Sequence, residues 1–431
     1  MSPSSSSFAY ELAALVQAQT RAHPGHPEGV YALPWYLVLG APSSGRSTAV
    51  KAMNLGWPHG DHPVAMPTPE PRASYWLAEK AVFIEPGPTV VGPQRQPSSL
   101  QELAAEIAAK RTREPIDGII LVLSVARMAD ETEAGVDDYV KAVRRQIVEV
   151  GQQLGAEVPV YVVVTMLDTL WGFGDVFHWT AARRDEEPWG FALPPGAPDG
   201  QTPARIDAEL EALTARLESY CFDKLSNEDP APGRVRAFQH LLETRDLMSR
   251  LRRAISLLAA GSAFESAPWI RALALGSGLP GTGQTLRHGR AKLGQMGLHP
   301  PAASGTPTPG GMPLHAFLEA VLLPERDLVP TRRRWRDDRV FLLLAMVGFV
   351  LWLGIAIVVG ARAAGAARGN GPQRWPGGQP LRAETVPMLT VNSKGISDQY
   401  LPTASCTYDH AAFAASSGPR KLMTSGATTN R

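Results

Sequence analysis

One uninterrupted apolar segment constrains the fold of this chain more than any other feature of the sequence. Residues 340–361 read VFLLLAMVGFVLWLGIAIVVGA and contain no charged side chain over 22 positions. At about 1.5 Å of rise per residue, a helix of this length crosses the hydrocarbon core of a bilayer, which is about 30 Å thick. No polar face interrupts the run, which disfavours a buried core helix. The segment lies too late in the chain to be a cleaved signal peptide. The sequence therefore predicts one membrane-spanning helix.

The charges that flank this segment are unequal. Six arginines precede it, and three follow over a similar distance: Arg326, Arg332, Arg333, Arg334, Arg336 and Arg339 before, then Arg362, Arg368 and Arg374 after. Cytoplasmic flanks carry the excess of basic residues, so the first 330 residues are predicted to be cytoplasmic. Residues 362–431 would lie across the membrane. They are rich in Gly, Pro, Ala, Ser and Thr, which predicts a disordered extracytoplasmic tail.

Composition excludes some classes of protein. The net charge is +1, which argues against a protein that binds nucleic acid through a basic face. The chain has two cysteines, Cys221 and Cys406, and no C-x-x-C pair. Neither a zinc site nor a disulfide framework is therefore predicted.

Strand and helix patterns alternate through residues 31–200. Buried strands are predicted at 35–40, 81–84, 118–125 and 158–165, and helices at 99–110 and 136–154. This alternation is typical of an α/β fold in which helices cover both faces of a parallel sheet. Ligands of such sheets bind at the carboxyl ends of the strands.

The remaining segments are mostly helical. An N-terminal extension, 1–30, contains a short amphipathic helix over 8–20, and residues 201–330 are predicted to form a helical extension. Two apolar stripes with helical spacing mark that extension: Ile206, Leu210, Leu213 and Leu217, then Met248, Leu251, Ile255 and Leu258. A last sheet strand is expected near 270–278, a flexible loop over 279–311 and a short amphipathic helix over 312–324.

The stretch GAPSSGRSTA, which follows the first predicted strand, nearly matches the phosphate-binding loop G-x-x-x-x-G-K-[ST]. Gly40 and Gly45 allow a backbone path that points N–H groups at anionic oxygens. Ser47 would supply the hydroxyl that binds Mg²⁺, and Thr48 follows it. Arg46 stands in place of the usual lysine, and its planar fork fits the loop interior poorly. A predicted strand precedes this stretch and a helix follows it. This context favours descent from a nucleotide-binding fold more than it favours a retained nucleotide activity.

Two further nucleotide motifs are also incomplete. The second strand ends in FIEPGP, where Glu85 keeps an acid that could assist Mg²⁺ but Pro86 removes an N–H donor. The fourth ends in TMLD, where Asp168 is kept as a base-selecting acid and Met166 replaces lysine; a turn or cap role for Asp168 is equally open. Because phosphoryl transfer depends on positioned charge, three incomplete motifs indicate that hydrolysis is lost. Binding of GTP or ATP with Mg²⁺ stays open.

Several collinear stretches resemble a known family, the TssM/IcmF inner-membrane components of type VI secretion systems. They are YALPWYLVLGAPSSGRSTA, EPIDGIILVLSVARM, VPVYVVVTMLDTLWGFGDVF, the WGF at 189–191, FESAPWIRALALGSG and MPLHAFLEAVLLPERDL. Together they extend from about 31 to 361. The resemblance covers the family's cytoplasmic domain and one membrane helix, and not its helical hairpin before that domain or its periplasmic arm.

The resemblance implies a P-loop GTPase-like core in the bacterial inner membrane, with the N-terminal domain cytoplasmic. It implies a structural role, in which a pseudo-GTPase domain docks TssL-like subunits or the baseplate within an oligomeric complex. A TssJ-like lipoprotein contact is not expected, because the periplasmic region that makes it has no counterpart here. The alternatives are a GTPase or ATPase switch that drives assembly, and a product whose periplasmic arm is on another chain or lost.

Overall fold

The fold is described from a computed structural model of the chain. The residues described are 5–26, 29–58, 60–66, 70–93, 95–96, 98–177, 188–196, 198–227, 231–261, 267–277, 297, 312, 314–329 and 332–369. They divide into one compact unit up to Leu353 and a second from Gly354. The predicted loop over 279–311, apart from Gly297, and residues 370–431 of the predicted tail lie outside the described residues.

The centre of the first unit is a seven-stranded sheet in the order β2-β3-β1-β4-β5-β7-β6. Five neighbouring strands run parallel: β3 (Val82–Pro86), β1 (Trp35–Gly40), β4 (Gly118–Ser124), β5 (Pro159–Thr165) and β7 (Trp269–Leu275). The two edge strands are antiparallel to their neighbours: β2 (Ala73–Leu77) pairs with β3, and β6 (Gly190–Ala192) pairs with β7.

The five predicted strands are confirmed at nearly the expected residues, but the sheet is mixed and not all parallel. The central strands are buried throughout, which explains why they read as continuous apolar runs. The antiparallel edges were not predicted. β2 begins within the Pro/Gly-rich stretch 56–74, and β6 has only three residues, so neither carries a strand-length periodic signal.

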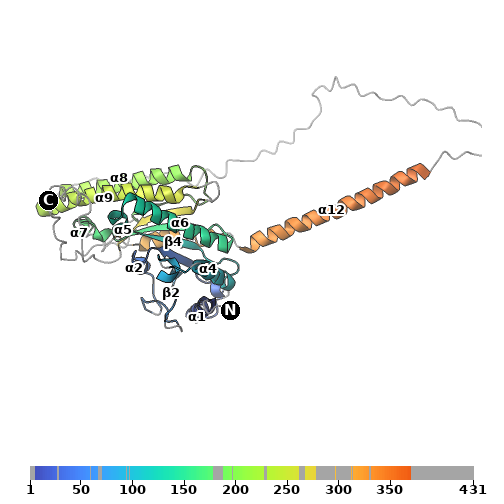
Figure 1. The fold of residues 1–431 in the computed structure, drawn as a ribbon, viewed down its shortest axis with the longest axis horizontal. Helices are drawn as coiled ribbons and strands as arrows, with labels where there is room; N and C mark the ends of the chain where they lie inside the picture. The colour runs from blue at the N-terminus through green and yellow to red at the C-terminus, as the bar shows by residue number, and fades with distance from the viewer. Residues whose placement is uncertain are drawn as a thin grey trace, which may run out of the picture. The chain divides into compact units, whose positions relative to one another are not determined.

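Long helices cover one face of the sheet. They are α1 (Ser5–Ala22), α4 (Ser99–Lys110), α6 (Glu133–Leu154), α8 (Thr202–Asn227) and α9 (Ala231–Ala259). Figure 1 shows α8 and α9 lying side by side as a hairpin, and both predicted apolar stripes of this hairpin are buried. Alternate strand residues such as Leu37, Ile119 and Val162 face these helices.

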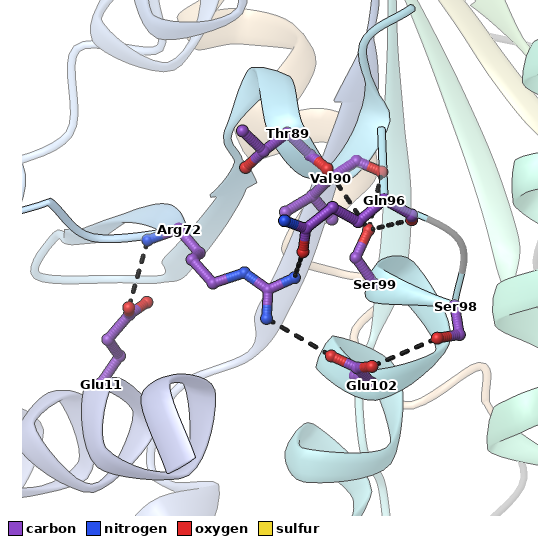
Figure 2. A network of polar contacts seen from close by, with 8 residues as sticks. All are labelled: Glu11, Arg72, Thr89, Val90, Gln96, Ser98, Ser99 and Glu102. Atoms are coloured by element: carbon purple, nitrogen blue, oxygen red, sulfur yellow. Dashed lines mark hydrogen bonds and ion pairs between the residues drawn. The ribbon is translucent and has the colours of Figure 1, made fainter. Parts of the chain in front are cut away.

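A network of polar contacts joins α1 to Arg72, the residue before β2, and to the segment from α3 (Pro88–Val91) to α4 that follows β3 (Figure 2). The Arg72 backbone N–H donates to the buried Glu11 carboxylate at 3.1 Å, and its guanidinium donates to Glu102 of α4 at 3.3 Å and to Gln96 at 3.4 Å. Ser98 donates to the same Glu102 carboxylate at 3.2 Å. The chain between α3 and α4 is therefore held to α1 by charge-assisted bonds.

The other face of the sheet has a much thinner cover. It consists of the seven-residue helix α2 (Arg46–Ala52) and of α11 (His315–Phe317) with the π-helix η4 (Leu318–Leu322). Phe317, Leu318 and Leu322 pack on strand residues such as Tyr36 and Tyr161. The predicted amphipathic helix at 312–324 is thus a short α-helix continued by a π-turn, and it completes the core.

The described chain ends in α12 (Arg332–Gly369), a helix of 38 residues. Its segment Leu343–Gly365 is long and apolar enough to cross a membrane, with a mean hydropathy of 2.6 and no burial of its side chains. This segment overlaps the predicted span, 340–361, and begins and ends a few residues later. Length and composition alone support the membrane assignment.

Candidate functional site: a closed phosphate-type loop

The turn between β1 and α2 has the glycine geometry of a phosphate-binding loop. Gly40 has φ +146°, and a Cβ there would lie 2.6 Å from the Val122 carbonyl oxygen of the neighbouring strand. Gly45 has φ +81° and precedes the first turn of α2. Both positions therefore require glycine. The two glycines of the predicted motif thus both have positive φ at this turn, and phosphate binding there stays a prediction.

Several polar groups of the loop are bonded within the protein. The Ala41 N–H donates to the Tyr139 hydroxyl of α6 at 3.1 Å, and the Ser44 N–H donates to the Ala41 carbonyl at 3.2 Å. The Ser44 carbonyl accepts a 2.6 Å bond from the Thr165 hydroxyl at the end of β5. The Ser44 hydroxyl is buried and, among the described residues, has no hydrogen-bond partner.

The buried side chain of Arg46, which replaces the lysine of the motif, contacts the end of β3. Its side chain is 6% exposed, and its Nη1 donates to the Pro86 carbonyl at 2.8 Å. Its Nε lies 3.5 Å from the Glu85 carboxylate. Burial lowers the pKa of Arg46, and the Glu85 charge opposes that shift. The guanidinium thus joins α2 to the end of β3.

Ser47 and Glu85, the predicted magnesium pair, lie in direct contact. The Ser47 hydroxyl is 2.8 Å and 3.0 Å from the two carboxylate oxygens of Glu85, and the indole N–H of Trp76 donates to one of them at 3.2 Å. Mg²⁺ requires open octahedral positions at about 2.0–2.1 Å. Here the carboxylate is enclosed by a hydroxyl, an indole and the Arg46 cation, a donor set that fits an anion and not a metal ion. Thr48 lies half-buried in the first turn of α2.

The third predicted motif lies at the same edge of the sheet, but its acid is engaged. Met166 has φ +65°, and its methyl carbon would lie 3.5 Å from a Cβ at Gly45. Asp168 follows in a short 3₁₀ turn and accepts a 2.7 Å hydrogen bond from Ser277. Burial raises the pKa of Asp168, and the bond from Ser277 opposes this. The three motifs are thus brought to one edge, and each is bonded to its protein neighbours.

Sequence reasoning missed the residues that close the site. Tyr139, Trp76 and Ser277 come from α6, β2 and the chain after β7, and no local pattern in the sequence marks them. A cleft of about 590 Å³ adjoins the loop, lined by Gly40–Pro42, Tyr139 and α6 side chains. It was not predicted either, because it depends on how α6 packs against the loop.

Fold and site together define a class of protein: an α/β core with a phosphate-type loop closed by its own side chains, followed by a candidate membrane helix. Residues 93–350 match the profile of the IcmF-related N-terminal domain, which is more than half of the chain. The chain belongs to the IcmF-related family.

A curated relative of this chain is the "Type VI secretion system component TssM1" of Pseudomonas aeruginosa. The two sequences are 29% identical over 216 residues. The match covers 47% of this chain and only 19% of that protein, so most of the relative has no counterpart in the alignment. The resemblance to the TssM/IcmF family that the sequence motifs indicate is thereby confirmed.

Two crystal structures of mutation variants of SsGBP overlap partly with the fold. The overlap with the first variant covers 37% of this chain and 46% of the variant's chain, at 10% sequence identity and a TM-score of 0.20. The overlap with the second variant covers 59% of this chain and 69% of the variant's chain, at 13% sequence identity and a TM-score of 0.21. At these scores the overlaps support no conclusion about fold or function.

Proposed function

We propose that this chain is a structural component of a type VI secretion membrane complex, in which the α/β core is a pseudo-GTPase domain that docks other subunits. Membership of the IcmF-related family and the similarity to a protein named as a type VI secretion component support this role. The candidate span Leu343–Gly365 would anchor the chain in the bacterial inner membrane, with the core in the cytoplasm.

The observation that carries the proposal is the contact of Arg46 and Ser47 with Glu85. A nucleotide-binding loop keeps a cation for the β and γ phosphates and a hydroxyl for Mg²⁺. In this chain the same two positions bond to one buried carboxylate and one carbonyl. Nucleotide binding would have to break these bonds and leave Glu85 buried beside phosphate charge, which is strongly unfavourable. The loop then serves as a structural turn.

The docking surface that we favour is the connected end of the α8–α9 hairpin. Phe222 lies five residues before the end of α8, and Val235 and Phe238 lie four and seven residues after the start of α9. Their exposed fractions are 47%, 68% and 51%. Exposed apolar residues gathered at one end of a helical hairpin are typical of protein interfaces. The expected occupant is another subunit of the complex, TssL-like or from the baseplate.

Site-specific photo-crosslinking tests this docking role. A photoreactive residue at Phe238 is expected to capture a subunit of the assembled complex in cells, while the same residue at Tyr10, 59% exposed on α1, serves as the matched control. Capture of the same subunit with equal yield at both positions would remove the support for this surface.

A nucleotide-dependent switch is the second candidate function. The two required glycines favour it, and so does the buried Ser44 hydroxyl, which has no partner within the described part of the chain, because a ligand could satisfy such a polar group in a phosphate-type loop. In that case Arg46, Ser47, Thr48 and Asp168 would rearrange on binding. The chain would then act as a switch that couples GTP or ATP to assembly, and not as a scaffold.

Titration of labelled GTP and ATP analogues with Mg²⁺ against the purified full chain separates the two functions. No saturable binding up to millimolar nucleotide is expected, and the variant Arg46→Lys is expected to behave alike because Glu85 still holds Ser47. Saturable binding in the micromolar range would establish the switch. Arg46→Ala, once shown to be folded, is expected to leave assembly of the complex intact.

A further inference from the structure

A second cleft, lined by charged residues, lies at the amino ends of the sheet's strands, beside the first residues of β1 and β4. Its volume is about 260 Å³. Eight residues line it: Tyr31, Pro34, Arg111, Arg113, Glu114, Asp117, Arg326 and Asp327. Six of them are charged, and the motifs of the sequence analysis assign no role to any of the six except the flanking charge of Arg326.

One buried guanidinium in this lining has an unused donor. Arg111 is 1% exposed, and its Nη1 pairs with the buried Asp117 carboxylate at 2.8 Å. The rings of Tyr31 and Trp35 lie 5.0 Å and 5.3 Å from its Cζ. Its Nε is buried and has no hydrogen-bond partner among the described residues. A buried donor of this kind costs about 1–3 kcal/mol unless an acceptor reaches it.

The rim of the cleft carries weakly engaged charges of both signs. Arg113 lies over the Tyr31 ring at 4.0 Å, and its guanidinium has no carboxylate partner among the described residues. Arg326 lies 3.7 Å from the adjacent Asp327 in the chain, a long contact between two exposed side chains. Glu114 is only half-buried.

The charges of the lining select a class of ligand. Three arginines face three acids, so the cleft has no net formal charge and complements neither a simple anion nor a simple cation. A molecule that carries a phosphate and a primary ammonium a few ångströms apart matches both signs. The volume also suffices. The cleft of about 260 Å³ holds roughly nine water molecules of about 30 Å³ each, and phosphoethanolamine has roughly eight non-hydrogen atoms.

The covalent chain places the cleft within reach of a membrane surface. Asp327 lies five residues before the start of α12 at Arg332, and Leu343 begins the candidate span eleven residues later. Five extended residues reach at most about 18 Å, and eleven helical residues rise about 17 Å. The cleft therefore lies at most about 35 Å along the chain from the apolar span.

We propose that this cleft binds the phosphoethanolamine headgroup of a membrane phospholipid. Arg113 and Arg326 bind the phosphate beside the buried Arg111 guanidinium, and Glu114 and Asp327 accept from the ammonium. The core would thus be held to the bilayer by a specific headgroup as well as by the helix. The inference rests on the proposed membrane span, and free phosphoethanolamine tests the cleft without any membrane.

Native mass spectrometry of the full chain in detergent, with added phosphatidylethanolamine, phosphatidylcholine or phosphatidylglycerol, is the direct test. The ethanolamine lipid is expected to be retained best. A choline group cannot donate hydrogen bonds to carboxylates, and glycerol carries no cation. Loss of two charge-assisted bonds in Arg113→Ser/Arg326→Ser is expected to weaken retention by about tenfold or more. Far-ultraviolet circular dichroism checks that this double variant is folded.

A second pair of variants separates recognition from general attraction to phosphate. Glu114→Gln/Asp327→Asn removes the two negative charges that pair with the ammonium and is expected to change the preference from phosphatidylethanolamine to phosphatidylglycerol. The matched control is Arg253→Ser, an exposed arginine that pairs with Asp137 on another surface; it should leave retention unchanged. A second control replaces Arg362 and Arg368, on the far side of the apolar segment.

Each outcome decides the proposal. Preferential retention of the ethanolamine lipid that both double variants alter supports it. Equal retention of all three lipids, or retention that only the Arg362/Arg368 control reduces, overturns it. Saturable binding of free phosphoethanolamine without retention of the lipid would keep the ligand chemistry and overturn the membrane source.

Discussion

The two ends of the strands, which we call the carboxyl edge and the amino edge of the sheet, differ in how completely their charged groups are paired. At the carboxyl edge, Arg46, Ser47 and Trp76 enclose the Glu85 carboxylate, and Ser277 bonds to Asp168. This is the edge where the nucleotide motifs lie. At the amino edge, buried pairs such as Arg111–Asp117 lie beside a polar cleft that retains an unused donor.

The difference shows that an inherited motif and an available site need not coincide. The loop keeps the glycines that its backbone requires, while Glu85 of β3 accepts from Ser47 and from Trp76 of β2, and Ser277 donates to Asp168. The opposite edge has no recognisable motif, yet it holds the polar groups that a ligand could still satisfy. Availability follows from hydrogen-bond accounting and not from sequence pattern.

The largest expected effect is at the amino edge, where the buried Arg271 forms an ion pair with the half-buried Glu325. Arg271 is 1% exposed and also donates to the Pro194 carbonyl, and Glu325 accepts from the Tyr161 hydroxyl at 2.9 Å. Glu325→Ala leaves the guanidinium buried without its counter-charge, which costs about 3–5 kcal/mol. Chemical denaturation of the full chain in detergent measures this loss.

The matched control for that variant is Glu319→Ala on the same segment. Glu319 pairs with Lys80 at 2.8 Å, but both side chains are largely exposed. Solvent-exposed pairs contribute little to stability, so the denaturation midpoint should scarcely move. Equal effects of the two variants would show that the Arg271–Glu325 pair does not anchor segment 314–329.

The next effect concerns the hairpin next to the carboxyl edge. His240 of α9 is buried, donates from Nδ1 to the Trp171 carbonyl at 3.1 Å and lies 3.3 Å from the Thr244 hydroxyl. Burial lowers its pKa from 6.5 to about 4. The unfolded chain therefore binds a proton that the folded chain refuses between about pH 6.5 and pH 4, and stability falls as the pH falls through that window.

The shift corresponds to about 3 kcal/mol in all, of which about 2 kcal/mol is lost by pH 5. Denaturation of the wild-type chain and of His240→Gln at pH 7 and pH 5 measures it. The variant is expected to show a smaller decrease in stability between these pH values, by about 2 kcal/mol. Identical decreases would mean that other groups cause the acid sensitivity at this edge.

A smaller effect is expected at the closed loop itself. Ser47→Ala removes a hydroxyl that bonds to Glu85 while the indole of Trp76 and Arg46 remain, so the loss should be about 1–2 kcal/mol. The same variant should leave the response to GTP and Mg²⁺ unchanged. A wild-type chain that is stabilised by GTP with Mg²⁺, and a variant that is not, would show that the carboxyl edge is open after all.

The smallest effect is expected at the connected end of the α8–α9 hairpin. Phe238 is 51% exposed, so Phe238→Ser should change the free energy of unfolding by no more than about 0.5 kcal/mol. Co-purification with the partner subunits should nevertheless decrease. A variant that lowers stability by several kcal/mol would show that this ring belongs to the core.

The sequence predicts those parts of the fold that local patterns encode. The β-branched run of β5, the exact bounds of α4 and the apolar stripes of α8 and α9 are periodic signals that burial then confirms. Strand β2 escapes prediction because it directly follows a proline-rich stretch that ends at Pro71. It becomes a strand only by pairing with β3, a tertiary effect.

The position of the candidate site could be predicted from the sequence, but the hydrogen-bond partners of its residues could not. The motif order places Gly40, Glu85 and Asp168 at one edge of the sheet, and the structure has them there. The spacing of Arg46 and Ser47 along the chain does not reveal that both lie against Glu85, 38 residues further on. Partners at long sequence separation, such as Ser277 for Asp168, decide the chemistry and leave no local pattern.

The cover of the sheet's second face has a consequence for biosynthesis. Residues 314–322, which pack on Tyr36 and Tyr161, are translated after every strand, and the apolar span ends only 43 residues later, at Gly365. At about 5–20 residues per second, the ribosome makes that interval in about 2–9 s. The nascent core thus receives this cover just as the candidate span is made, so closure of the core and completion of that helix fall in the same few seconds.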